Sequence, residues 1–118
     1  MNGSSNLTLR EDVDSGALII AANIQYQRSV CACQEIATIV QEIIKTEKHH
    51  KVIIDLTPTQ RVGARCLGGF IQTALQLKKS GRQLVICHAK PSIAKLLKDL
   101  RLDEQINIYS TIIEALAD

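Results

Sequence analysis

The sequence is poor in aromatic residues, lacks tryptophan and has no long apolar run. Aromatic residues make up 3% of the 118 residues while hydrophobic residues make up 46%, so any core must be aliphatic. No stretch approaches the roughly 18 apolar residues that a membrane-spanning helix needs. The opening residues, MNGSSN, do not follow the basic-then-apolar pattern of a signal peptide. These absences predict a cytoplasmic protein without a membrane span.

The chain also lacks a strong excess of charge of one sign. Fourteen Lys and Arg residues stand against twelve Asp and Glu residues, which gives a net charge of +2. A nucleic-acid-binding domain usually carries a markedly basic face, so the balance argues against DNA or RNA as a partner. The length fits one domain, for which we expect the bounds 1–118 with a flexible N-terminus over residues 1–5.

Cysteine is present but sparse, at positions 31, 33, 66 and 87. An even number of cysteines permits disulfides, although the chain is not a small cysteine-rich secreted scaffold. Because the cytoplasm is reducing, we expect all four cysteines to be free thiols.

Hydrophobic periodicity predicts alternating strands and helices. Strand patterns occur at residues 7–11, 17–21, 52–56, 83–87 and 106–109. Helical patterns begin near Ser29, Cys66, Pro91 and Ser110 or Thr111, and Ser80-Gly81 is typical of a helix C-terminus. The order β-β-α-β-α-β-α-β-α predicts a single α/β domain with a mostly parallel sheet of four or five strands and about four helices. The unbroken apolar run at 52–56 predicts a central strand that is buried on both faces.

Two groups of residues are candidates for reactive sites. Cys31 and Cys33 with His49-His50 superficially suggest a metal site, but residues two apart on a helix point about 200° away from each other. Cys66 begins a helix near Arg61 and Arg65, which favours a thiolate, yet a nucleophile also needs a base, and His88 is the only candidate at a neighbouring strand end. We therefore expect no catalytic residue, no metal site and no cofactor. Asp55, at the end of the central strand, is either functional or a cap for the next loop.

From Lys51 onward the chain resembles the STAS domain, the anti-sigma factor antagonist family, of which SpoIIAA is a member. The resemblance is carried by the strand Val52-Ile53-Ile54-Asp55-Leu56-Thr57, by Leu67-Gly68-Gly69-Phe70, by the passage Lys79-Ser80-Gly81-Arg82-Gln83-Leu84-Val85-Ile86, and by Pro91-Ser92-Ile93 with the leucines that follow it up to Leu102. Ile108-Tyr109 and Glu114-Ala115-Leu116 complete the match. The resemblance implies a STAS-like fold over the whole chain.

The signature loop of that family departs from its usual sequence. The family motif reads Asp-Ser-Ser-Gly-Leu and carries a serine that a partner kinase phosphorylates. The ungapped match here is Gly63-Ala64-Arg65-Cys66-Leu67, so the acidic residue and both serines are absent. Ala64 and Arg65 form a degenerate phosphosite, because alanine cannot accept a phosphate and arginine has the wrong charge to imitate one. Whether Thr57 or Thr59 accepts a phosphate instead is left open.

The resemblance implies a non-enzymatic protein-interaction module of a bacterial cytoplasm. Its implied partners are an anti-sigma factor, a serine kinase or another STAS protein, and a homodimer is possible. The predicted partner-binding loop consists of Arg61, Val62, Gly63, Ala64, Arg65 and Cys66. Its arginines favour an acidic partner surface, since guanidinium groups bind carboxylates in bidentate fashion. Two alternatives remain: an accessory STAS subunit of a lipid-transport ATPase complex, and a regulatory domain that binds a small anion or nucleotide.

Overall fold

The computed structural model describes residues 7–23, 29–59 and 62–117, except for the side chains of residues 29–33 and 64–65. In this part of the chain, five strands form one sheet in the order β1-β2-β3-β4-β5. The strands are β1 (Leu7–Glu11), β2 (Leu18–Ala22), β3 (Lys51–Asp55), β4 (Gln83–Cys87) and β5 (Asn107–Tyr109). β1 is antiparallel to β2, and the other neighbours are parallel. The predicted α/β fold is confirmed.

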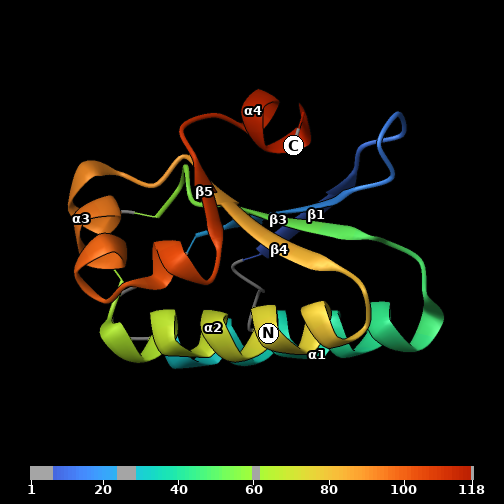
Figure 1. Cartoon of the computed structure of the whole chain (residues 1–118), viewed down its shortest axis with the longest axis horizontal. Helices are drawn as coiled ribbons and strands as arrows, with labels where there is room; N and C mark the ends of the chain where they lie inside the picture. The colour runs from blue at the N-terminus through green and yellow to red at the C-terminus, as the bar shows by residue number, and fades with distance from the viewer. Residues whose placement is uncertain (1–6, 24–28, 60–61, 118) are drawn as a thin grey trace.

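The helices lie on both faces of the sheet (Figure 1). α1 (Ser29–Thr46) and α2 (Ala64–Lys79) run side by side beneath it, and α4 (Ile112–Ala117) covers the opposite face. α3 (Pro91–Asp99) and the short 3-10 helix η2 (Leu102–Glu104) connect β4 to β5. We call the face of the sheet that α1 and α2 cover the lower face, and the face that α4 covers the upper face.

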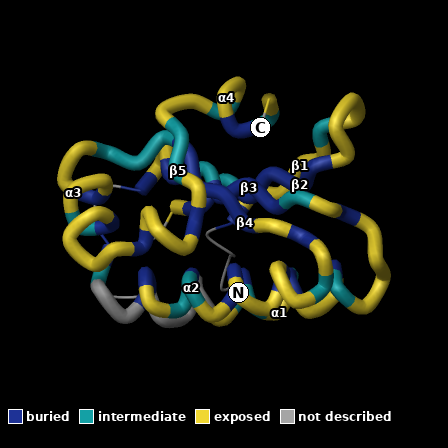
Figure 2. The backbone as a smooth tube through the Cα atoms, viewed as in Figure 1, coloured by how far each residue is buried: buried dark blue, intermediate teal, exposed yellow. Residues whose placement is uncertain are grey.

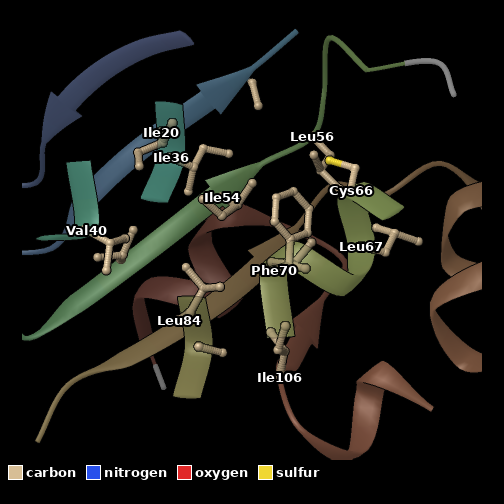
Figure 3. Close-up of a cluster of buried hydrophobic side chains, with 14 of the residues drawn as sticks. Ile20, Ile36, Val40, Ile54, Leu56, Cys66, Leu67, Phe70, Leu84 and Ile106 are labelled. Carbon is tan, nitrogen blue, oxygen red and sulfur yellow. The ribbon is translucent and has the colours of Figure 1, made fainter. Parts of the chain in front are cut away.

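The large core lies between the lower face and the helices α1, α2 and α3. It is aliphatic apart from Phe70 and Cys66, as the low aromatic content predicts. Figure 3 shows its centre, where α2 places Phe70 next to Ile54 of the sheet and Leu67 on the other side of Phe70. A second, smaller core lies on the upper face, and its buried residues are Ala17, Ile19, Ile53, Val85, Cys87 and Ala115. Both faces of β3 are therefore covered, as the unbroken apolar run predicts (Figure 2).

Turn and capping signals of the sequence also appear in the structure. α2 ends at the predicted Ser80-Gly81, where Gly81 has φ +81° and the Arg82 N–H donates to the Leu77 carbonyl at 2.8 Å. This pair of a left-handed glycine and a backward hydrogen bond is a Schellman motif. At the start of α4, the Glu114 N–H donates to Oγ1 of Thr111 at 3.2 Å and the Thr111 N–H donates to the Glu114 carboxylate at 3.1 Å. Thr111 is thus the cap of the last helix.

Candidate functional site

The predicted partner-binding loop is shorter than the sequence suggests. α2 begins at Ala64, so Ala64, Arg65 and Cys66 form the first helical turn instead of loop. Val62 is buried and Gly63 is the N-cap residue. Arg61 and the side chains of Ala64 and Arg65 lie outside the described residues, so the predicted degenerate phosphosite is placed here only by its backbone.

The N-terminus of α2 has no side-chain cap, because glycine occupies the cap position. Gly63 is extended, with φ −90° and ψ 157°, and its carbonyl accepts hydrogen bonds from the N–H groups of Cys66 and Leu67 at 3.1 and 3.3 Å. The aspartate of the family motif matches this position and could cap the helix, whereas Gly63 cannot. The first turn of α2 is held instead by burial, since Cys66 and Leu67 are both fully buried.

The two threonines before the loop differ sharply in exposure. Thr57 is exposed, and its hydroxyl donates to the carboxylate of Asp55 at 2.6 Å. Thr59 is fully buried, and its hydroxyl donates to the carbonyl of Ala22 at 2.5 Å. A kinase can reach the first hydroxyl in the folded domain but not the second. Thr57 is therefore the more accessible of the two open phosphorylation candidates.

The expectation of four free thiols is wrong at Cys66. Cys66 is disulfide-bonded, whereas Cys87 is free and buried. The remaining cysteines, at positions 31 and 33, belong to the first turns of α1, and their side chains lie outside the described residues. Sequence spacing cannot reveal such a pairing, because it depends on which elements lie next to each other in the folded chain.

A second group of reactive side chains meets at the carboxyl ends of β3 and β4. One ligand-type atom of each of Asp55, Cys87 and His88 lies within 4.8 Å of the others. Asp55 and Cys87 are paired across the two parallel strands, so their side chains point to the same, upper face. Burial raises the pKa of the Cys87 thiol to about 12; the Asp55 carboxylate adds to this rise, and the Arg10 guanidinium opposes it. Cys87 is therefore a protonated thiol at neutral pH.

His88 reaches this group through an unusual backbone conformation. Its φ is +58°, in the left-handed region, which costs a non-glycine residue about 1–2 kcal/mol. In a continuing strand His88 would point away from Cys87, since successive side chains alternate between faces. Its Nε2 instead accepts a hydrogen bond from the Ile112 N–H, at the first residue of α4, at 3.2 Å.

Asp55 does serve as a cap for the following turn. Its Oδ1 accepts hydrogen bonds from the Thr57 N–H at 3.0 Å and from the Thr57 hydroxyl. Sequence reasoning did not connect Asp55 with Cys87 and His88. One sequence pattern could have predicted this cluster. Two apolar strands end at these residues, and the carboxyl ends of neighbouring parallel strands lie at one edge of the sheet.

Comparison with known proteins identifies the family. A model of the STAS domain matches residues 15–115, and the chain belongs to the STAS domain family. A search of the curated proteins finds no relative. Among the described residues, no helix has both the length and the apolar character needed to cross a bilayer.

Solved structures confirm the fold at low sequence identity. An anti-sigma-factor antagonist (STAS) domain protein from Planctomyces limnophilus is 18% identical, with a TM-score of 0.75 over 94% of this chain and 95% of that one. The anti-sigma factor antagonist SpoIIAA in its unphosphorylated form is 14% identical, with a TM-score of 0.74 over 93% of this chain and 92% of that one. The murine anion transporter Slc26a9 is 15% identical, with a TM-score of 0.66 over 87% of this chain but only 17% of the transporter.

Proposed function

We propose that the protein is a non-enzymatic regulator of the anti-sigma factor antagonist type that acts without phosphate control in a bacterial cytoplasm. The observation that carries this proposal is the start of α2. The STAS strand, turn and helix are intact around it, yet Gly63, Ala64, Arg65 and Cys66 offer no hydroxyl group. SpoIIAA, which is similar in fold, has been solved in both an unphosphorylated and a phosphorylated form. A domain with alanine at position 64 would stay in the unphosphorylated form.

Arg61 and Arg65 would select the partner. Guanidinium groups bind carboxylates in bidentate fashion, so these two arginines favour a partner surface rich in carboxylates. Lys90 adds positive charge to the segment between β3 and α2, since its ammonium group donates a hydrogen bond to the carbonyl of Thr57. The partner would be an anti-sigma factor, a serine kinase or another STAS protein, and a homodimer is a further form that the same surface would permit.

The test is a pull-down with purified anti-sigma factor and serine kinase from the same genome. The double variant Arg61→Glu, Arg65→Glu should lose capture, and the wild-type interaction should weaken with added salt, because exposed charge contacts are screened. The matched control is Lys78→Glu, Lys79→Glu. It changes the net charge equally at the exposed far end of α2, about 20 Å along the helix from position 65. Equal capture by the wild type and both double variants would contradict the proposal.

One comparison supports a second function. A segment of the anion transporter Slc26a9 is similar in fold to this chain. We therefore keep the accessory subunit of a transport complex, such as a lipid-transport ATPase, as the alternative. Co-purification with a transporter from detergent-solubilised membranes, in place of an anti-sigma factor, would favour it. Binding of a small anion or nucleotide near the α2 N-terminus remains a third proposal, and thermal stabilisation by nucleotides or phosphate would reveal it.

A further inference from the structure

We propose that Asp55, Cys87 and His88 form a binding site for a divalent cation of the zinc type. The three side chains supply a carboxylate oxygen, a sulfur and an imidazole nitrogen within 4.8 Å of one another. Zinc accepts this mixture of ligands, and three protein ligands with one open position are a recurrent zinc coordination. The inference is independent of the proposed partner, because the site uses no residue of the Arg61–Cys66 segment.

β3 and β4 hold Asp55 and Cys87, and the β4–α3 connection holds His88, so the sheet need not rearrange to bring the ligands together. The pairing of Asp55 with Cys87 is fixed by the β3–β4 register, so these two ligands cannot slip relative to each other. The left-handed conformation of His88 turns the ring toward the same face. Cys87 is fully buried, whereas Asp55 and His88 are partly exposed, so an ion would enter past the carboxylate and the imidazole.

The local charges favour a divalent cation. Coordination requires the Cys87 thiolate, which with the Asp55 carboxylate gives two negative charges beside the ion. The Arg10 guanidinium is close enough to act on Cys87 and supplies one opposing positive charge. Arg10 cannot be a ligand, since a guanidinium has no lone pair to donate. Removing its charge should therefore strengthen binding, which distinguishes a cation site from a site for an anion.

Binding would compete with the contact that His88 makes with α4. A neutral imidazole has one acceptor nitrogen, and the Ile112 N–H already uses it. A coordinated ion would take that lone pair or force the other tautomer, and in both cases the hydrogen bond is lost. Loss of one such bond costs roughly fivefold in affinity. We therefore expect occupation of the site to loosen the first turn of α4.

Cobalt(II) is the probe, because its bond to a thiolate produces a charge-transfer band in the near ultraviolet. The full chain, freed of metal with a chelator, is titrated without reductant, so the disulfide of Cys66 stays closed and its two sulfurs cannot bind the ion. The wild type should develop the band at an equimolar amount of cobalt. Zinc should then abolish it by displacement. The variant Cys87→Ser should show no band, whereas Cys31→Ser and Cys33→Ser should retain it.

Ligand and charge variants give a second, independent measurement of affinity. Asp55→Asn and His88→Asn should each weaken cobalt binding at least tenfold, and asparagine tolerates the left-handed backbone at position 88. Arg10→Gln should strengthen binding severalfold. If Cys87→Ser does not fold, as judged by circular dichroism, these three variants decide the question. A wild type without the band at tenfold excess cobalt, a band that survives in folded Cys87→Ser, or unchanged affinity in Asp55→Asn would overturn the proposal.

Discussion

The side-chain amide of Gln41 on α1 donates a hydrogen bond of 2.8 Å to the side-chain oxygen of Gln76 on α2. The two residues are exposed and lie in the parallel helices that together cover the lower face. This bond joins the C-terminal halves of the two helices, and the disulfide-bonded Cys66 lies near the start of α2. The Cys66 side chain belongs to the buried core that α2 forms with the sheet.

Reduction of the disulfide at Cys66 should lower stability measurably. A disulfide in a small domain typically contributes about 2–4 kcal/mol by restricting the unfolded chain. For a domain of this size, that corresponds to a fall in Tm of roughly 10 °C or more. Thermal unfolding is measured with and without a phosphine reductant. Cys66→Ser serves as the control and should show the lower Tm in both conditions. A wild-type Tm that does not respond to reductant would contradict the disulfide.

The two threonines before α2 should respond differently to the same substitution. Thr59→Val leaves the buried Ala22 carbonyl without its side-chain donor, which should cost about 1–3 kcal/mol. Thr57→Val removes an exposed bond to Asp55 and should cost less than about 1 kcal/mol. Urea unfolding of the pair measures the difference. Equal losses would show that the buried hydroxyl is not a structural donor.

Restoring a serine at position 64 should leave the fold unchanged. Ala64→Ser substitutes a residue in the first turn of α2, where such a change should alter stability by no more than about 0.5 kcal/mol. With the serine kinase of the same genome and ATP, only the variant should incorporate phosphate at this position. Gly63→Asp, Ala64→Ser adds the missing acidic residue, and more phosphate in this double variant would show that the kinase also reads the aspartate. If the kinase instead phosphorylates the wild-type protein at Thr57, regulation by phosphorylation has moved to that residue and has not been lost.

The thiol of Cys87 should make stability fall in alkaline solution. Its pKa is about 12 in the folded protein and 9.0 in the reference state, because burial and the Asp55 carboxylate disfavour the thiolate. The folded state therefore holds its proton more tightly than the unfolded state. This contribution is complete below about pH 9 and is lost as the pH rises toward 12, by about 1.4 kcal/mol per pH unit. Urea unfolding of wild type and Cys87→Ala, both with chelator present, isolates the effect. If the free energy of unfolding depends on pH in the same way in both proteins, the predicted contribution of Cys87 is wrong.

Much of the fold could be predicted from the sequence because strand and helix periodicities are local. The apolar run at 52–56 and the Ser80-Gly81 cap have the structures their patterns predict, since short-range sterics and burial decide both. The sequence predicts the start of α2 two residues too late, because Gly63 offers none of the side-chain signals that normally mark an N-cap. The disulfide at Cys66 and the meeting of Asp55 with Cys87 depend on which elements become neighbours in space, and a single sequence does not record those contacts.

The unequal thickness of the two helical layers decides which part of the molecule opens first. α4 has six residues and covers the smaller core, and the Lys51 ammonium and the His88 ring each bind one of its backbone groups. Its amide hydrogens should therefore exchange with solvent through local openings, whereas those of α2 require an event close to global unfolding. Each such opening exposes Cys87 and Ala115, which belong to the core of the upper face. The amide hydrogens of α4 should thus exchange faster than those of α2. Alkylation of Cys87 should proceed at the rate at which α4 opens.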